Sequence, residues 1–226
     1  MFSRLKNKKI LVVASHPDDE VLGCGGTIAK LIHNKNQVHV YFSHEGSSSR
    51  YDDYKNKKSL NEIKKRNGMA LRCSKFLGYN IVEFGNNVNL RNENFSVLNN
   101  VKKLDKIINK IKPDIIITHH PDDINDDHQI TFKIVSNATR PPAKHLVKEI
   151  YLMEIPSTTD WTLRSSFMPN IFVDSNKHPL NNTLSLLYVE SNEDYMLCFD
   201  HSESLGLPIS CLEKLNSKKI YTHDKK

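Results

Sequence analysis

Apolar residues along the chain fall alternately into short unbroken runs and into repeats of helical spacing. The run at 10–14 contains no polar residue, which is typical of a strand buried on both faces. Leu98, Val101 and Leu104 recur every three residues, which favours a helix with one apolar face. Strands that alternate with helices predict βαβ units around a mostly parallel sheet, and therefore an α/β protein. We expect strands at 9–14, 38–43, 80–84, 114–118 and 149–153, with a helix after each of the first four.

The composition fits one globular domain. The chain has 226 residues, of which 38% are hydrophobic and 26% charged, and this is enough apolar surface to build a core. No linker or internal repeat divides it, so we expect a single domain over 1–226, with a divergent and shortened segment from about residue 176. The longest apolar runs have the length of a strand, so no membrane span is expected. The run after the basic N-terminus is also too short for a secretory signal.

Cysteine spacing and charge narrow the expected location and partners. Cys24, Cys73, Cys198 and Cys211 are far apart and form no CxxC pair, so we expect free thiols in a reducing compartment, and a cytoplasmic protein. The formal net charge of +6 comes with no arginine-rich helix and no aromatic RNA-binding signature. A nucleic-acid partner is therefore not expected. The sequence leaves the oligomeric state open.

Histidines and aspartates crowd two of the predicted strand ends. The first strand is followed by SHPDDE at 15–20, and the fourth by HHPDDINDDH at 119–128. In open sheets of this kind, ligands bind at the carboxyl ends of the parallel strands. Carboxylates packed this closely repel one another unless a cation lies between them. The two segments therefore predict a metal site to which both contribute.

Three residues of these segments form a candidate ligand set. His16 and Asp19 are three residues apart and can point to one side of a first helical turn, and His128 is the candidate from the second segment. Two imidazoles and one carboxylate leave the fourth position of a tetrahedral zinc ion open for water, and Fe(II) accepts the same ligands. Asp18 is then placed to act as general base toward that water. The predicted reaction is hydrolysis at a carbonyl group.

The two segments together resemble the PIG-L/LmbE family of zinc-dependent N-acetylglucosaminide deacetylases. The resemblance is carried by HPDDE at 16–20, LGCGGT at 22–27 and NDDH at 125–128, and it extends from about residue 9 to residue 174. It implies a Rossmann-like three-layer sandwich that removes the acetyl group from an N-acetylated amino sugar. By matching position, it makes His16, Asp19 and His128 the zinc ligands and Asp18 the base.

The second segment departs from the commonest family pattern at Asn125, where many relatives have a histidine. An asparagine amide can donate a hydrogen bond to an oxyanion, an interaction worth roughly 3–4 kcal/mol, but it cannot deliver a proton. It can equally form an Asx turn. Because Asn125 cannot deliver a proton, Asp18 would serve as both base and acid, unless His119 or His120 substitutes. For His119, a structural role at the strand end is favoured. Asp127 is expected to orient its catalytic neighbours.

Candidates for substrate contacts lie outside the ligand set. Arg50 could bind a phosphate, so the expected small-molecule substrate is an amino-sugar conjugate, with phosphorylated and nucleotide-linked forms included; the alternative is a simple loop arginine. Trp161 could stack on a sugar ring or serve only in packing. His120 could face the site or point away from it. The basic residues at 64–66 are interpreted as part of a solvated helix face.

Two alternatives remain open, and one motif is set aside. A receiver-like or phosphatase-type domain would hold Mg²⁺ on Asp18 and Asp19, but oxygen-rich sites of that kind do not call for histidines. A catalytically weakened, sugar-binding family member is suggested by Asn125 and by the shortened C-terminal segment. The glycines at 23–26 do not have the GxGxxG spacing of a dinucleotide loop, and we expect them to permit close packing at a helix start.

Overall fold

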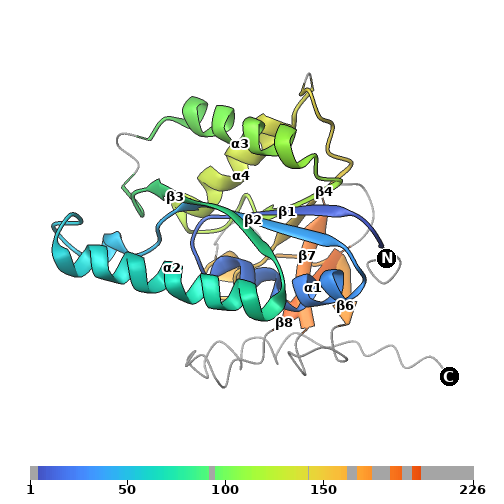
Figure 1. Cartoon of the computed structure of the whole chain (residues 1–226), viewed down its shortest axis with the longest axis horizontal. Helices are drawn as coiled ribbons and strands as arrows, with labels where there is room; N and C mark the ends of the chain where they lie inside the picture. Colours follow the sequence, from blue (N-terminus) through green and yellow to red (C-terminus); the bar gives the residue numbers. More distant parts are fainter. Residues whose placement is uncertain are drawn as a thin grey trace.

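A parallel sheet runs through the centre of the protein (Figure 1). The five strands expected from the apolar runs are all present, each within about three residues of its expected ends, and they are parallel to one another. The computed structural model describes residues 5–91, 95–141, 143–161, 167–174, 184–189 and 195–199. The parallel strands are β1 Lys9–Ala14, β2 Gln37–His44, β3 Asn80–Asn87, β4 Ile115–His119 and β5 Glu149–Met153.

Three further strands extend the sheet beyond β5. They are β6 Ile171–Asp174, β7 Leu184–Val189 and β8 Tyr195–Phe199. β7 is antiparallel to β5, and the order across the sheet is β3-β2-β1-β4-β5-β7-β6-β8. β7 and β8 belong to the segment after residue 176, whose other residues lie outside those described. The extent of the single domain therefore stays a prediction.

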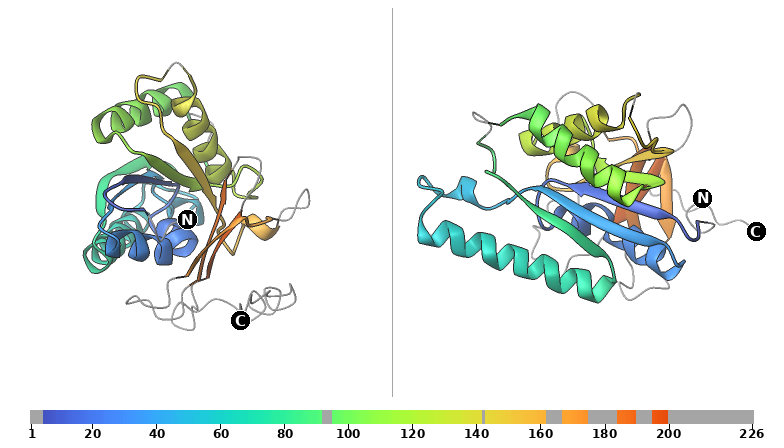
Figure 2. Two further views of the ribbon diagram at one scale, coloured as in Figure 1. Left: turned by 90° about the vertical axis from the view of Figure 1, so that its right-hand side faces the viewer. Right: turned by 45° about the horizontal axis from the view of Figure 1, so that its top comes forward.

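Helices cover both faces of the sheet and make a three-layer α/β sandwich (Figure 2), as the sequence predicted. α1 Asp19–His33 and α2 Lys57–Leu77 cover one face, and α3 Val97–Ile111 and α4 Asp126–Thr139 cover the other. In β1, Ile10 and Val12 pack with α1 and α2, while Leu11 and Val13 pack with α3 and α4. Because both faces are buried, the strand has no polar alternation. Within the described residues, no helix has the length and apolar character needed to cross a bilayer.

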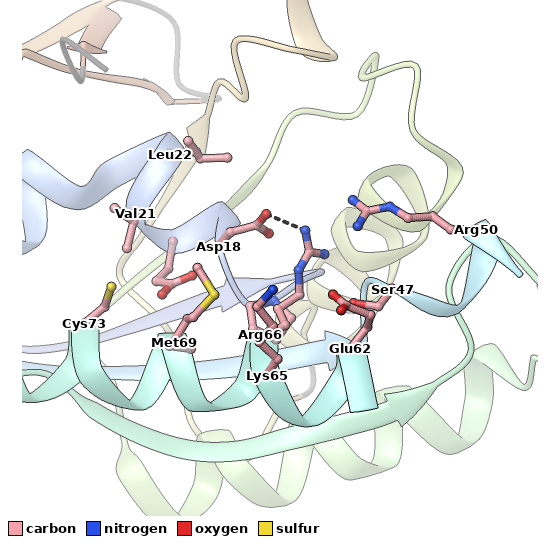
Figure 3. A pocket seen from close by; sticks show the side chains of 13 residues that line it. Asp18, Val21, Leu22, Ser47, Arg50, Glu62, Lys65, Arg66, Met69 and Cys73 are labelled. Atoms are coloured by element: carbon pink, nitrogen blue, oxygen red, sulfur yellow. Dashed lines mark hydrogen bonds and ion pairs between the residues drawn. The ribbon is translucent and has the colours of Figure 1, made fainter. Parts of the chain in front are cut away.

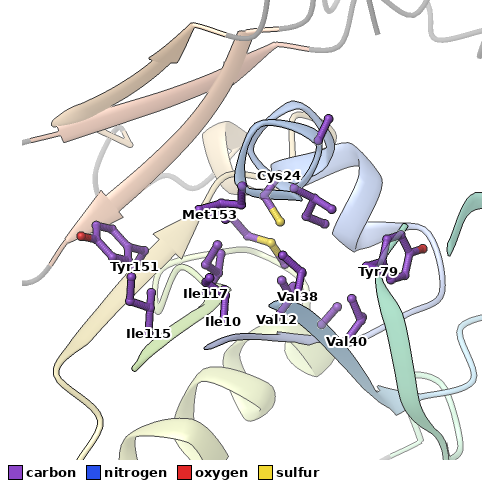
Figure 4. Packing of buried hydrophobic residues seen from close by; sticks show 14 of the residues in the cluster. Ile10, Val12, Cys24, Val38, Val40, Tyr79, Ile115, Ile117, Tyr151 and Met153 are labelled. Atoms are coloured by element: carbon purple, nitrogen blue, oxygen red, sulfur yellow. The ribbon is translucent and has the colours of Figure 1, made fainter. Parts of the chain in front are cut away.

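The start of α1 packs very closely on the sheet. Figure 4 shows Cys24 of α1 with Met153 of β5, above Val12 and Ile117 in the neighbouring strands. A Cβ added at Gly23 would lie 2.8 Å from Met153 Sδ, a distance that real Cβ atoms essentially never show. The expectation that the glycine run permits close packing is therefore confirmed at Gly23.

The strand order reverses beside β1. β2 and β3 lie on one side of β1, and β4 and β5 lie on the other. The chain leaving β1 and the chain leaving β4 therefore diverge, and a crevice opens between them at the carboxyl edge of the sheet. Both of the segments rich in histidine and aspartate begin at this crevice, so the fold brings together residues that are more than a hundred positions apart in the sequence.

Candidate active site

The two segments meet at the crevice beside β1. His16 follows β1, Asp19 is the first residue of α1, and His128 lies in the first turn of α4. All three are at most 5% exposed. The ring centroids of His16 and His128 lie 5.2 Å apart. The convergence that the sequence predicted is therefore present, and we call these three residues the ligand cluster.

One atom from each residue of the ligand cluster forms a nearly equilateral triangle. His16 Nδ1 lies 3.3 Å from Asp19 Oδ2 and 3.3 Å from His128 Nε2, and the third side, from His128 Nε2 to Asp19 Oδ2, is also 3.3 Å. Tetrahedral zinc with bonds of about 2.0–2.1 Å places its ligand atoms roughly 3.3–3.4 Å from one another. The donor set therefore fits a zinc ion, and its ligand types also suit Fe(II).

Each histidine of the cluster is held from its outer side by another carboxylate. His16 Nε2 lies 3.0 Å from Asp127 Oδ2, and His128 Nδ1 lies 3.1 Å from Asp123 Oδ2. A carboxylate in this position favours a proton on the outer nitrogen, so the inner nitrogen keeps its lone pair for a metal. Asp127 thus has an orienting contact of the kind expected from the sequence. Asp123 was not predicted from the sequence, because nothing distinguishes it within its run of aspartates.

The outer carboxylates are themselves fixed by hydrogen bonds. Asp127 Oδ2 accepts from Asn89 Nδ2 at 2.8 Å and from the backbone N–H of Leu90 at 2.9 Å. Asp123 Oδ2 accepts from Thr159 Oγ1 at 2.7 Å. Both carboxylates are fully buried. These bonds hold the two histidine rings in fixed orientations.

The carboxylates determine the charge preference of the cluster. Burial alone would lower the pKa of His16, but Asp19 and Asp127 outweigh it and raise the pKa to about 9. Burial likewise disfavours the protonated form of His128, but Asp19 and Asp123 raise its pKa to about 10. The Asp19 carboxyl, which burial would make less acidic, has its pKa held well below the usual range by the two imidazoles. The cluster therefore attracts positive charge, and a metal ion would bind in competition with protons.

His119 lies against the cluster but has a different role. Its ring stacks on that of His128 at 4.0 Å, and its Nε2 lies 3.4 Å from Asp19 Oδ2. That Nε2 accepts a hydrogen bond of 2.8 Å from the backbone N–H of Ser15, so its lone pair is already used. His119, Asp123 and His128 could also surround an ion, but Asp123 is already bonded to His128 and Thr159. The structural role favoured for His119 agrees with these contacts.

A chain of buried hydroxyl groups connects the carboxyl ends of β1 and β2 to α4. Ser15 Oγ donates to the Asp127 carbonyl at 2.9 Å, and Thr131 Oγ1 lies 2.7 Å from the hydroxyls of both Ser15 and Ser43. Each hydroxyl has one proton, so Thr131 donates to Ser15 and Ser43 donates to Thr131. His44 Nδ1, 2.8 Å from Ser43 Oγ, must then be the last donor. Burial lowers the pKa of His44 to about 4, so this ring is neutral and its proton is on Nδ1.

Two residues that support the site, His44 and Asn89, were not predicted although a signal for them exists in the sequence. His44 ends β2, and Asn89 follows β3 by two residues. Both therefore lie at the carboxyl edge of the sheet, where the strand-end argument located His16 and His128. Polar residues that follow the second and third predicted strands are therefore candidates for the site in the same way as those that follow the first and fourth.

The Asp18 side chain pairs with Arg66 beside the ligand cluster. Asp18 is the N-cap residue of α1, but its side chain makes no capping hydrogen bond. Its Oδ2 instead accepts a bond of 2.7 Å from Arg66 Nη2, and the side chain is 40% exposed. Burial of the carboxyl group and the neighbouring Asp19 raise the pKa of Asp18, against the influence of Arg66. The predicted base therefore lies next to a candidate ligand, and it is not used to cap the helix.

The interpretation of Arg66 as part of a solvated helix face is wrong. Lys64 and Lys65 are exposed as expected, but the Arg66 side chain is only 21% exposed and also donates to the Gly46 carbonyl. Gly46 has a φ of +75°, and a Cβ there would lie 2.8 Å from His16 Cβ. Glycine is therefore needed where Arg66 and His16 approach from two sides. Only the packing of α2 beside the start of α1 distinguishes Arg66 from its lysine neighbours.

Asn125 forms the Asx turn that the sequence left as an alternative. It is the N-cap of α4, and its Oδ1 accepts from the backbone N–H of Asp127 at 3.0 Å. This bond uses the side-chain oxygen only. The Nδ2 group is therefore the part of Asn125 that could still donate to an oxyanion.

A cleft of about 450 Å³ opens beside Asp18, between the start of α1, the 3-10 helix η2 Ser48–Arg50 and α2 (Figure 3). Glu20 lines it as a buried carboxyl group, whose Oε2 has no hydrogen-bond partner among the described residues. Burial raises the pKa of Glu20 to about 8, so this group is mostly uncharged at neutral pH. The lining is polar at one end, with Ser47, Arg50, Glu62, Lys65 and Arg66, and apolar at the other, with Val21, Leu22, Met69, Ala70 and Cys73; it also includes Pro17.

The three predicted substrate contacts have different surroundings. Arg50 is exposed and lines the cleft. Trp161, in the 3-10 helix η4 Thr159–Trp161, is 45% exposed. His120 accepts at Nδ1 from the backbone N–H of Asp122 at 3.2 Å and packs edge-on against Phe167. Neither Trp161 nor His120 lines this cleft, and all three substrate contacts stay predictions.

Comparison with known proteins connects this site to a described family. The family model PIG-L, described as GlcNAc-PI de-N-acetylase, matches residues 11–139 and so includes both segments of the site. The chain is 28% identical over 172 residues to the uncharacterized deacetylase YaiS of Escherichia coli K12, across 74% of this chain and 82% of that protein.

Solved structures share the fold at lower identity. GalB, the 4-carboxy-2-hydroxymuconate hydratase of Pseudomonas putida KT2440, is 20% identical with a TM-score of 0.61, over 75% of this chain and 73% of its own. The N,N'-diacetylchitobiose deacetylase of Pyrococcus horikoshii is 24% identical with a TM-score of 0.56, over 74% of this chain and 64% of its own. A hydratase and a deacetylase thus share this architecture, so the fold by itself does not identify the reaction.

Proposed function

The chain belongs to the PIG-L family of deacetylases, and on that premise we propose that it is a zinc-dependent hydrolase that removes the acetyl group from an N-acetylated amino sugar. The observation that carries the proposal is the triangle of ligand atoms with sides of 3.3 Å. Its size suits tetrahedral zinc. Asp18 is adjacent in the chain to the ligand Asp19, and it lines the cleft.

His16, Asp19 and His128 would hold the metal in this proposal. A bound zinc ion supplies Lewis-acid polarisation of the amide carbonyl and lowers the pKa of a water molecule to near 7. Fe(II) is the alternative ion. The outer contacts of Asp127 and Asp123 would keep both imidazoles oriented with their lone pairs inward. The magnesium alternative is less well supported, because two of the three ligand atoms are nitrogens.

Asp18 would move the protons of the reaction. Its raised pKa brings it closer to the pH at which a carboxylate is an effective general base. It would take a proton as the water oxygen adds to the amide carbon. It would then return that proton to the nitrogen as the C–N bond breaks, which leaves acetate and a free amine. Asn125 cannot perform the second step, because an amide does not release a proton at neutral pH.

Asn125 and the cleft would bind the substrate. Asn125 Nδ2 is proposed to donate to the oxyanion, since Oδ1 is occupied by the turn. Arg50 would contact the sugar or an attached phosphate at the polar end of the cleft, and His120 and Trp161 stay as further candidates for substrate contacts. Within the described part of the chain, Cys24 and Cys73 form no disulfide. The cytoplasmic location expected from the sequence is kept as part of the proposal.

Acetate release tests this function directly. The purified protein, loaded with zinc or with Fe(II), is incubated with free, nucleotide-linked and lipid-linked N-acetylglucosamine, with and without a chelator. We expect one metal ion per chain and metal-dependent release of equal amounts of acetate and amine. Stoichiometric metal with no release from any substrate would instead support the sugar-binding alternative. Failure to bind zinc or Fe(II) would overturn the proposed ligand cluster.

A further inference from the structure

The cleft changes from polar to apolar along a single face of α2. Glu62, Arg66, Met69 and Cys73 all line it, and their spacing of three or four residues places them on one face of the helix. The charged residues occupy the first half of this face. After Arg66 no charged residue of α2 lines the cleft, within the part of the helix that the structure describes.

α1 supplies the opposite wall of the apolar half. Val21 and Leu22 are half-buried and line the same cleft. Figure 3 shows Val21 and Leu22 on one side of Asp18, with Cys73 below them, and Arg50 on the other side. Asp18 therefore lies between an apolar end and a polar end. Glu20 also lines the cleft; its carboxyl group is fully buried and accepts at Oε1 from the Tyr79 hydroxyl at 2.7 Å.

This polarity matches the two sides of an N-acyl amino sugar. The bond that Asp18 would act on joins a hydroxyl-rich sugar to a hydrocarbon chain, so the sugar suits the Arg50 end and the acyl chain suits the end formed by Val21, Met69 and Cys73. We propose that this apolar end binds an acyl chain longer than acetyl, and that the preferred substrates have N-acyl groups of about four to eight carbons. The inference rests on the proposed function and makes acetyl the shortest chain that the site accepts.

The length of the apolar face sets the upper limit of the chain. Phe76, three residues after Cys73 on the same face, is 66% exposed and continues the apolar surface beyond the cleft. At about 1.5 Å per helical residue, the stretch from Met69 to Phe76 is roughly 10 Å long. An extended chain advances about 1.2 Å per bond, so roughly eight carbons reach the position of Phe76.

A series of N-acyl glucosamines tests the inference. The zinc-loaded protein is assayed for amine release from the acetyl, butyryl, hexanoyl and octanoyl compounds. Burial of one methylene corresponds to about a threefold to fourfold gain. Because the cleft is open, we expect kcat/KM to rise by about tenfold or more from acetyl to hexanoyl. If the acetyl compound is cleaved but kcat/KM stays equal or falls along the series, the inference is overturned and the proposed function stands. If no amide of the series is cleaved, the proposed function itself is overturned.

A pair of matched variants tests the location of the chain. Cys73→Trp fills the apolar end, and we expect it to bring the hexanoyl-to-acetyl ratio of kcat/KM down to about one. Leu71→Trp adds the same side chain at a residue of α2 that is 45% exposed and does not line the cleft, so it should leave activity and ratio unchanged. An unchanged ratio in Cys73→Trp would overturn the inference. So would a gain that follows an octyl group on the sugar's anomeric oxygen and not the acyl chain, because the apolar end would then bind the aglycone.

Discussion

Asp19 belongs to the ligand cluster and its neighbour Asp18 lines the cleft, yet the two carboxylates differ in burial and in their partners. Asp19 is 5% exposed at its side chain and contacts three histidines, whereas the Asp18 side chain is 40% exposed and has Arg66 as its ion-pair partner. The turn into α1 directs one carboxylate inward and the other outward. Rigid, fully bonded groups suit the holding of a cation, and a partly exposed carboxylate suits proton exchange with a bound substrate.

Substitutions on the two sides of this turn should separate metal binding from turnover. Asp18→Asn keeps the size of the side chain but removes the base, so we expect kcat to fall by about 10²–10⁴-fold while one metal ion per chain is retained. His128→Ala removes a ligand, and both metal and turnover should be lost. Metal content is measured on the purified protein, and amine release is measured under saturating substrate.

The contrast between these two variants is the informative result. If Asp18→Asn also loses its metal, Asp18 belongs to the cluster and the division between cluster and cleft is wrong. If Asp18→Asn keeps both metal and activity, another group acts as base. His119 is a poor candidate for that role, because its Nε2 accepts from Ser15.

A substitution in the chain of buried hydroxyl groups tests whether that chain stabilises metal binding by the ligand cluster. Thr131→Val preserves shape but leaves the hydroxyls of Ser15 and Ser43 without their shared partner, which we expect to lower the free energy of unfolding by about 1–3 kcal/mol. Because Ser15 also bonds to the Asp127 carbonyl, metal affinity should fall by roughly tenfold or more. Urea unfolding and competition with a chelator measure the two effects.

Thr118→Val is the matched control for this experiment. Thr118 is also fully buried, but its hydroxyl donates to the Val13 carbonyl at 2.9 Å, within the sheet. We expect a similar loss of stability with no change in metal affinity. Equal losses of affinity in both variants would mean that general destabilisation, and not the network, weakens the site.

Most of the fold could be predicted from the sequence because its strands are buried on two faces. A run such as 10–14 has no alternation of apolar and polar residues, so it indicates a central strand even when the neighbouring strands are unknown. The ligand cluster was predictable for a related reason: strand ends in a parallel sheet share an edge, so residues following two such runs must lie close together. His16 and His128 satisfy both conditions.

The cleft was less predictable because it depends on how helices pack. Arg66 and its lysine neighbours look alike in the sequence, and only the approach of α2 to the start of α1 turns the arginine toward Asp18. The apolar end of the cleft was not expected for the same reason. In the sequence, Met69 and Cys73 fit the pattern of an ordinary helix face. Only the packing of α1 against α2, which places Val21 and Leu22 in the same cleft, identifies them as part of its lining.

The smallest expected effect concerns the amino edge of the sheet, where Asp114 belongs neither to the ligand cluster nor to the cleft. Asp114 immediately precedes β4, and its carboxylate accepts from Lys148 Nζ at 3.0 Å and from the backbone N–H of Lys9 at 3.2 Å. Burial would raise the pKa of Asp114, but Lys148 and the Lys9 N–H outweigh it and lower the pKa.

A carboxyl group with a lowered folded-state pKa stabilises the protein above its unfolded pKa of about 3.9, and this stabilisation is lost as the pH falls through the folded-state value. Asp114→Asn should therefore lower the free energy of unfolding by no more than about 1 kcal/mol at pH 7, with a difference from the parent protein that shrinks as the pH falls below about 4. Urea unfolding at several pH values measures this difference. Metal content and turnover should be unchanged, and a loss of either would mean that the ligand cluster depends on the whole length of β4 and not only on the contacts at its carboxyl end.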